Sequence, residues 1–600
     1  MSTPIKVNKV GVCFDRVRIS DDYEVYRVNL SSGKINVGSY LLDAPVMDNT
    51  VLSVYFTRGR SFYVLMASCR DAKQKLKAAI ASQQEADDLT IEAVDIMHLE
   101  DAVLLQLMIN ALGNYKSASL RSSNLTGHNY TYNPDLIKHK RGENTIWQVP
   151  CIEIRVDQEM VLHADVRTFS SVKLRSKMTF GKKTFRDYPQ YVFSAKRTLS
   201  RKKKDDKSED SFILRQVDGQ KTVIPFLDIK NIGAFYASKV GIVQSVITQF
   251  NAVYAGYAKL TLHEVKEYRS LCSRPAIAKK KDDAVLVHEL LSQQKVNVVD
   301  TIGNEGSEAF CTKVVDILKG KYGVEAAITD EVSGNALNIR VIHNADYYDA
   351  GTDRYLVSKD AAIQHITMED FASPESAIAV VVHDLIIKSD LQHSKISLYD
   401  WVSLNYQDDI VFGSMVHSDD KDCYYFMTIH SDGTFIIKEE TDDFLGESAY
   451  DKYINMLSAG EDDGNIKGIV GIGEDSIYII KDVGLIALPN LDGIANELES
   501  GNTKLRGKSM RESLLSGCLD IRTYDEDGHT YYFVGDIGAG MQTTVGHAAN
   551  IRELCTEGSG KVDIERVLPL MDVDFVRNGQ LTVVPFPFKY LREYIRSHLV

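Results

Sequence analysis

Basic side chains are concentrated in the middle of the chain, where together they could bind a polyanion. Residues 116–280 contain 30 Lys and Arg against 15 Asp and Glu, whereas the remainder contains 39 against 68, and the whole chain carries a net charge of −14. This asymmetry predicts a positively charged groove on a protein whose outer surface is otherwise acidic.

Two groups of basic residues are candidates for contacts to a nucleic-acid backbone. The first lies in stretches that read as strands, which would fix the charges in space. The second lies in the run "RTLSRKKKDDKSED", which is equally well explained as a solvated loop. The candidates are Arg155, Arg167, Lys173, Arg175, Lys177, Arg201, Lys202 and Lys203.

Other kinds of chemistry have little support in the sequence. The eight cysteines show no C-x-x-C pair or metal-ligand spacing, which favours reduced thiols in the cytoplasm. There is no Walker A sequence, and "GDIGAGM" has the wrong glycine spacing for a dinucleotide site. The histidines show no ligand-like pairing on a helix face. The polar start predicts no signal peptide, and His383 and Asp384 interrupt the best apolar run, so we expect no membrane span.

The elements that must position these residues change in character along the chain. Residues 1–115 mix alternating runs with two helical stretches and predict an α+β unit. Residues 116–282 are strand-rich and end in the helical "SKVGIVQSVITQFNAVYAGYA". Residues 283–372 alternate strands and helices, as in an open α/β domain.

The last unit, residues 373–600, begins with Ser373 and Pro374, a helix start with a serine N-cap and a proline in the first turn. The helix that follows is apolar nearly all round and is expected to be buried. Three strands then follow in sequence order, and helices and strands alternate after them. We expect helices at "SAYDKYINMLS", "LDGIANELES" and "GHAANIRELC". This order is typical of an RNase H-like fold.

The end of the chain carries a resemblance to a known family. The stretch "LTVVPFPFKYLREYIR" resembles the end of an Argonaute PIWI domain, where a strand leads into Pro-x-Pro-x-x-Tyr and a terminal helix. Pro585, Pro587 and Tyr590 match that spacing. Further upstream, "DLIIKSDL" and "IQHITM" resemble the family's buried phosphate-binding helix and a strand of its MID domain.

The resemblance implies a bilobed, multidomain α/β and α+β fold with a Rossmann-like MID domain (283–372) and an RNase H-like PIWI domain (373–600). The unit before them, 116–282, would hold the linker regions. The PAZ domain would be absent or reduced, because only about 45 residues separate "RTFSSVKLRSK" from "KTVIPFLDIK".

The resemblance also implies a site for the 5′ end of a guide strand. Lys388 and Gln364 would bind its phosphate, Tyr348 would stack on its first base, and the carboxylate of Val600 would hold Mg²⁺ together with Gln364. A terminal phosphate carries close to two negative charges, so a fixed cation and an amide donor suit it. An aromatic ring suits a splayed base, and Mg²⁺ can bridge two anions. The alternative for the terminal helix, with Leu591, Ile595 and Leu599 on one face, is simple packing.

Departures from the family predict that the chain does not cleave nucleic acid. Cleavage by a PIWI domain needs clustered carboxylates around two metal ions. Met415 stands where the first aspartate is expected, and Asp482 is the lone match for a later one. The acidic runs "SDDKD" and "KEET" are the candidates for replacements.

By its resemblance, the chain is similar to inactive Argonautes of the plasmid-defence (DdmE-like) type. These imply a DNA guide paired with a DNA target, in defence against plasmids or phage, and an effector helicase-nuclease as partner. Two alternatives stay open: an active RNase H-like nuclease with other carboxylates, and a scaffold or receptor module that binds no nucleic acid.

Overall fold

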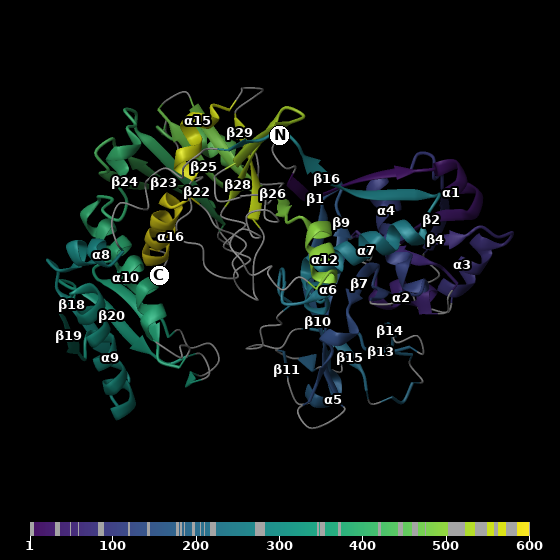
Figure 1. The fold of residues 1–600 in the computed structure, drawn as a ribbon, viewed down its shortest axis with the longest axis horizontal. Helices are drawn as coiled ribbons and strands as arrows, with labels where there is room; N and C mark the ends of the chain where they lie inside the picture. The colour runs from purple at the N-terminus through teal and green to yellow at the C-terminus, as the bar shows by residue number, and fades with distance from the viewer. Residues whose placement is uncertain are drawn as a thin grey trace.

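The structure of the chain is a computed structural model. It describes residues 5–30, 37–47, 50–57, 59–81, 89–117, 120–140, 145–175, 179–180, 183–184, 187–194, 198–203, 206–208, 210–215, 224–270, 283–344, 347–348, 354–369, 374–417, 422–441, 448–458, 466–473, 476–501, 522–534, 549–556, 562–571 and 585–598. Figure 1 shows a mixed α/β protein whose elements form two groups. No helix in these segments is long and apolar enough to cross a membrane.

The N-terminal unit is a four-stranded antiparallel sheet with helices packed on it. Its strand order is β3-β4-β2-β5, and its buried residues include Val28, Val54, Phe62 and Leu76. The elements are α1 (Arg16–Asp22), β2 (Tyr23–Leu30), α2 (Ser39–Met47), β3 (Ser53–Tyr55), β4 (Ser61–Ala67), α3 (Ala72–Ala81) and β5 (Leu89–Val94). The expected α+β character is therefore observed.

The strand-rich middle of the chain forms an eight-stranded sheet. Its main path is β14-β13-β15-β10-β9-β7-β6, with β8 paired to β9. The buried helix α4 (Asp101–Asn110) packs on β9. The strands are β6 (Arg121–Leu125), β7 (His128–Tyr132), β8 (Lys138–His139), β9 (Ile146–Val156), β10 (Leu162–Ser171), β13 (Tyr191–Phe193), β14 (Leu199–Arg201) and β15 (Phe212–Leu214); α5 (Val172–Arg175) and a hairpin of β11 (Thr179–Phe180) and β12 (Lys183–Thr184) extend from it.

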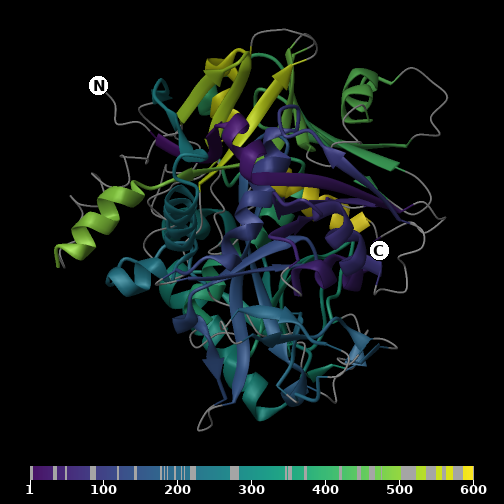
Figure 2. The ribbon, with the colours of Figure 1, turned by 90° about the vertical axis from the view of Figure 1, so that its right-hand side faces the viewer.

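The two groups of elements are connected through strands that are distant in sequence. The first strand, β1 (Ile5–Phe14), pairs with β16 (Ala258–Val265) and also with β26 (Ser476–Leu488) of the C-terminal sheet. The helix α12 (Leu491–Glu499) packs on α6 (Ile232–Tyr236) and α7 (Lys239–Val253), and is the light-green helix at the left of Figure 2. The expected helix near residues 238–258 is α7.

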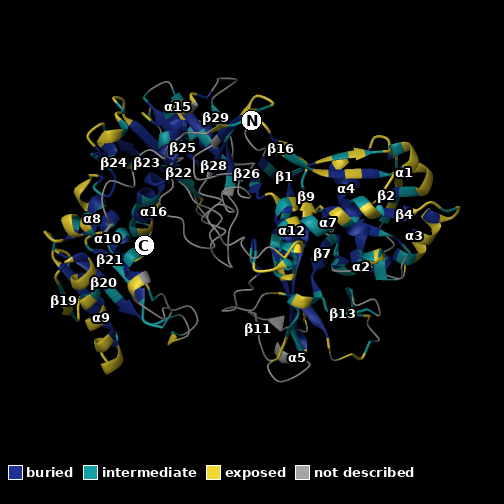
Figure 3. Cartoon of the chain, in the orientation of Figure 1, coloured by how far each residue is buried: buried dark blue, intermediate teal, exposed yellow. Residues whose placement is uncertain are grey.

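Residues 283–369 form an open sheet of four parallel strands in the order β19-β18-β20-β21. Helix α9 begins at a capping box on Asn304 and ends at Gly323, whose φ of 64° is left-handed. Its outer face is exposed in Figure 3. The elements are α8 (Asp283–Leu291), β18 (Val296–Asp300), α9 (Glu305–Tyr322), β19 (Ala326–Thr329), β20 (Leu337–Ile342) and β21 (Ala362–Thr367). The expectation of an α/β unit is confirmed at this level.

The long helix α10 (Pro374–His393) covers this parallel sheet. It packs on β20, β21 and α9, and its residues Ile378, Val382, Leu385 and Ile386 are buried. We expect this helix to open the last unit, 373–600. In the structure it packs on the parallel sheet and also on α16 (Pro587–His598) of that unit, so the domain boundary at residue 373 stays a prediction.

The C-terminal sheet contains the expected meander of three strands that follow one another in the sequence, β22, β23 and β24. Its order is β17-β27-β28-β29-β26-β25-β22-β23-β24, with α11 (Asp451–Ser458) and α16 (Pro587–His598) on opposite faces. An alternation of helix and strand predicts parallel pairs, but β22 pairs with β25 in antiparallel fashion, as do β25 and β26. The remaining strands are β17 (Arg269–Ser270), β22 (Ile410–His417), β23 (Asp422–Ile429), β24 (Phe435–Thr441), β25 (Ile466–Ile472), β27 (Arg522–Glu526), β28 (His529–Val534) and β29 (Ala549–Thr556).

The helix expected at "GHAANIRELC" is wrong, because the described part of this stretch is strand β29. Alanine, arginine, glutamate and leucine all favour helices, but β29 pairs along its length with both β26 and β28. Two ladders of backbone hydrogen bonds override the local preference. The helices expected at "SAYDKYINMLS" and "LDGIANELES" are α11 and α12.

Candidate anion-binding site

A cavity of about 1010 Å³ lies where β21, α10 and α16 meet. Its polar lining comes from all three elements, although β21 and α16 are more than 200 residues apart in the sequence. Gln364 lies on β21, Asp384 and Lys388 lie one turn apart on α10, and Glu593 and Arg596 lie on α16. The structure therefore brings together Gln364 and Lys388, two of the residues that the sequence suggested.

Lys388 is the cation on the α10 side of the cavity. Its ammonium donates to the carbonyl oxygen of Ile363 on β21 and lies 3.6 Å from a carboxylate oxygen of Glu593. Burial lowers the pKa of Lys388, although the carboxylates of Glu593 and Asp384 raise it. An ammonium with little access to water interacts strongly with any anion that enters beside it.

Gln364 and Asp384 form the back of the cavity. The side-chain amide of Gln364 donates to Asp384 Oδ2 at 3.2 Å, and the Lys589 ammonium lies 2.9 Å from Asp384 Oδ1. The Asp384 side chain is only 4% exposed, so its negative charge is compensated by Lys589 rather than by water. Gln364 is thereby held in one orientation at the wall of the cavity.

Helix α16 contributes a charged face that the sequence analysis missed. Lys589, Glu593 and Arg596 follow one another at helical spacing, and both cations lie within 3.8 Å of Glu593. The signal was present, since these positions lie opposite the apolar Leu591 and Ile595 on the same helix. With Lys388, the group has three cations against the carboxylates of Asp384 and Glu593, a net charge of +1 that favours an anion.

The apolar side of α16 fixes this charged face in place. Leu591 and Ile595 are buried, as expected, and Pro587 begins the helix. The buried hydroxyl of Tyr590 donates to Asp390 Oδ2 on α10 at 2.6 Å. The match at Pro585, Pro587 and Tyr590 thus marks the attachment of α16 to α10. The other two residues of interest, Leu599 and Val600, lie outside the described residues.

Tyr348 is not among the residues that line the cavity. Its hydroxyl accepts a hydrogen bond of 3.2 Å from the amide of His343, and the two rings are edge-to-face. Two tyrosines line the cavity instead, Tyr594 on α16 and Tyr355, which is 47% exposed and has the Arg354 guanidinium 4.9 Å from its ring centre. Tyr355 could not be predicted, because the exposure of an aromatic residue is not visible in the sequence pattern.

The described part of the cavity does not fit a Mg²⁺ site. Mg²⁺ needs several oxygen ligands that are free of other cations, but Asp384 and Glu593 already lie beside Lys388, Lys589 and Arg596. In the segments that the structure describes, no three His, Cys, Asp or Glu side chains are grouped as metal ligands. The Mg²⁺ expectation rests on Gln364 and on Val600, which is outside those segments, and it stays a prediction.

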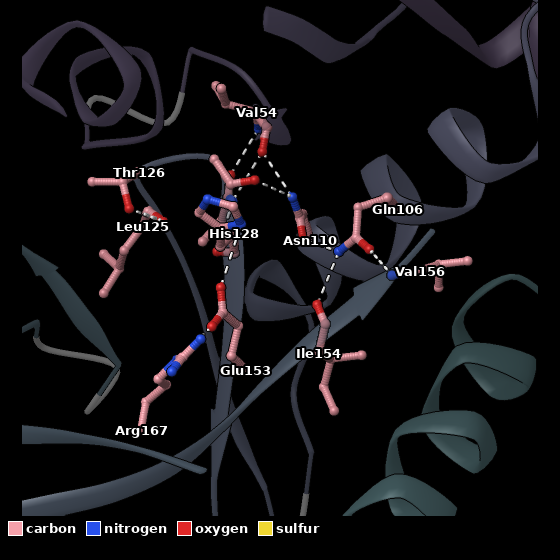
Figure 4. Close-up of polar contacts among 12 residues, drawn as sticks. Val54, Gln106, Asn110, Leu125, Thr126, His128, Glu153, Ile154, Val156 and Arg167 are labelled. Atoms are coloured by element: carbon pink, nitrogen blue, oxygen red, sulfur yellow. Dashed lines mark hydrogen bonds and ion pairs between the residues drawn. The ribbon is translucent and has the colours of Figure 1, made fainter. Parts of the chain in front are cut away.

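The basic residues predicted to contact a nucleic-acid backbone have different surroundings. Arg155 and Lys173 are exposed on β9 and α5, in the other group of elements from the cavity (Figure 1). Arg167 donates to Glu153 at 2.6 Å (Figure 4); burial lowers the pKa of Arg167, but this carboxylate raises it above its usual value. Arg167 is exposed like Arg155 and Lys173, and its guanidinium is paired with Glu153.

The second basic group is partly engaged within the protein. Arg201 is 12% exposed and lies 3.4 Å from the buried carboxylate of Asp43, with its guanidinium over the rings of Tyr40 and Tyr191. Lys202 donates to the carbonyl oxygen of Ser208 at 2.5 Å, and Lys203 is exposed. The side chain of Arg175 and all of Lys177 lie outside the described residues.

Met415 and Asp482 lie on opposite faces of the C-terminal sheet. Met415 packs with Tyr453 and the other apolar residues under α11. Asp482 follows Ile480 by two residues on β26, on the face that packs toward α16. Even an aspartate at position 415 would therefore point away from Asp482, and these two positions cannot share a metal ion.

Asp482 has a structural explanation of its own. In the strand register it lies opposite Arg552, which is fully buried and has the buried Tyr532 on its other side. The Lys467 ammonium is 3.7 Å from Asp482, and the amide of Gly484 donates to it at 3.2 Å. A carboxylate opposite a buried guanidinium reduces the electrostatic cost of burying that charge.

Comparisons with known proteins add no family assignment to this geometry: no protein-family model matches the sequence, and no curated protein matches it significantly.

Proposed function

We propose that the protein binds a short guide strand by its phosphorylated 5′ end and uses the guide to recognise complementary nucleic acid. The observation that carries this proposal is the cavity in which Gln364 and Lys388, taken from two separate motifs, meet the charged face of α16. Its net positive charge, its partly buried ammonium and its amide donor suit a terminal phosphate. The exposed ring of Tyr355 at the same cavity suits the first base of the guide.

The rest of the chain suits a partner that is longer than one nucleotide. The excess of basic residues in 116–280 includes the exposed Arg155 and Lys173, and they lie in the group of elements across from the cavity (Figure 1). Basic side chains of this kind bind the phosphate backbone of a nucleic acid and do not distinguish its base sequence. Base pairing between guide and target would then supply the specificity. We propose DNA for both strands, by analogy with the family that the sequence resembles.

We further propose that the parallel sheet acts as a MID-like domain and the C-terminal sheet as a PIWI-like domain without nuclease activity. The opposite orientation of Met415 and Asp482 supports the second part. The antiparallel pairing of β22 and β25 is the feature that this assignment must accommodate. Degradation of the target would fall to an effector helicase-nuclease, in defence against plasmids or phage.

The proposal is tested by binding of a labelled DNA target to protein that has been loaded with a 5′-phosphorylated DNA guide. A complementary target should bind much more tightly than a scrambled target, and omission of the guide should abolish the difference. The target should stay intact with Mg²⁺ or Mn²⁺ present. Equal binding of both targets would support the scaffold alternative, and cleavage of the complementary target would support an active nuclease.

A further inference from the structure

Glu593 is surrounded by cations in the way that a bound anion would be. Its carboxylate lies 3.2 Å from Arg596, 3.6 Å from Lys388 and 3.8 Å from Lys589. The side chain is 7% exposed, yet it lines an open cavity of about 1010 Å³. Three cations from two helices thus converge on one oxygen-bearing group that belongs to the protein itself.

A carboxylate and a phosphate compete for the same partners. Both present oxygen acceptors to Lys and Arg donors, and both interact most strongly with these cations where little water is present. A phosphate that entered beside Lys388 would face the negative charge of Glu593 at close range. It would either displace this carboxylate from the cations or bind against its repulsion.

We propose that Glu593 is a resident competitor for the anion position of the cavity, and that it weakens binding of a terminal phosphate until the ligand displaces it. This inference rests on the proposed function of the cavity. It adds that Glu593 sets the affinity of the cavity for the phosphate. An end group without charge, such as a 5′ hydroxyl, does not compete for the cations. Glu593 therefore lowers the affinity only for strands that carry the phosphate.

Glu593→Gln tests the inference, because the amide keeps the shape of the side chain and removes its charge. Affinities of the full-length protein are measured for one short DNA strand with and without a 5′ phosphate, at fixed salt. The variant should bind the phosphorylated strand about tenfold or more tightly than the wild type, with little change for the unphosphorylated strand. Glu308→Gln, an exposed glutamate on α9, is the matched control and should change neither affinity.

The opposite results have distinct meanings. Unchanged or weaker binding of the phosphorylated strand by Glu593→Gln would overturn the inference, since Glu593 would then orient the lysines rather than compete with the ligand. Thermal unfolding of Glu593→Gln shows whether a loss of binding reflects misfolding. In that case the affinity of Glu593→Asp for the phosphorylated strand is compared with that of the wild type, because this variant keeps the charge on a shorter side chain. If the wild type itself does not distinguish the two strands, the proposed function fails instead.

Discussion

Asp43 illustrates at the level of one residue how two units of the chain are joined. It lies on α2 and is 2% exposed; one of its carboxylate oxygens accepts from the amide of Thr126, and the other lies 3.4 Å from Arg201. Burial raises the pKa of Asp43 to about 7, although Thr126 and Arg201 lower it. Arg201, suggested by the sequence as a ligand contact, thus serves an internal contact.

The pH dependence of stability should reveal this carboxyl group. Its pKa in the folded state, about 7, lies above the value of about 4 for an unfolded aspartate. The folded protein therefore binds the proton more readily between these values, and the contribution of Asp43 to the free energy of unfolding falls as the pH rises from about 4 to 7. Asp43→Asn should gain stability relative to the wild type over that window.

Denaturant unfolding of both proteins at several pH values measures the difference. The control is Asp316→Asn, which changes an exposed residue on α9. A difference between Asp43→Asn and the wild type that stays constant between pH 5 and 7 would contradict the role of Asp43.

A second prediction at the level of single residues concerns the contribution of Asp482 to stability. If its role is to face the buried Arg552, Asp482→Asn should lower the free energy of unfolding by about 1–2 kcal/mol, less than a fully buried pair would lose. Lys467→Met removes only a partly exposed partner and should cost less than about 1 kcal/mol. Loss of guided cleavage in Asp482→Asn with stability unchanged would instead identify Asp482 as a catalytic residue.

At the level of elements, the terminal helix α16 holds the cavity together through its buried side. Burial raises the pKa of Tyr590 well above its usual range, so its hydroxyl stays a donor to Asp390. Tyr590→Phe should lower the free energy of unfolding by about 1–3 kcal/mol, because a buried carboxylate loses a hydrogen bond.

Tyr594→Phe is the matched control on the same helix. It should change stability by less than about 0.5 kcal/mol, because Tyr594 is partly exposed and packs against His598 through its ring. Chemical denaturation of the wild type, Tyr590→Phe and Tyr594→Phe measures these differences in the free energy of unfolding. Equal stabilities would show that the hydroxyl of Tyr590 does not hold α16 against α10.

The elements also show what could be predicted from the sequence. Helix α16 was predictable because Leu591 and Ile595 repeat at helical spacing. The α/β character of residues 283–372 was predictable because strand-like runs such as "KVNVVD" and "ALNIRVI" alternate with helical ones, whereas the short, largely exposed strand β19 was not predicted. Strand β29 was not, since only its pairing with β26 and β28 overrides a helical composition. The antiparallel pairing of β22 and β25 was hidden for the same reason, because direction is set by contacts between distant residues.

At the scale of the whole molecule, the chain brings a cavity with a net positive charge and a basic middle part into one protein that is acidic overall. Resemblance located Gln364 and Lys388, which line one cavity, and it pointed to Tyr348, which does not line it. The cavity itself could not be predicted, because Asp384, Lys589 and Arg596 acquire their roles only when α10 and α16 pack together.

The most direct test of the account is the affinity of the wild type and Lys388→Ala for one short DNA strand with and without a 5′ phosphate, in EDTA and at fixed salt. We predict that the wild type prefers the phosphorylated strand by about tenfold or more, that Lys388→Ala binds both strands equally, and that Lys313→Ala, which alters an exposed lysine of α9, behaves like the wild type. A parallel measurement in Mg²⁺ shows whether a cation strengthens the preference. Equal affinity of the wild type for both strands under both conditions would contradict the account.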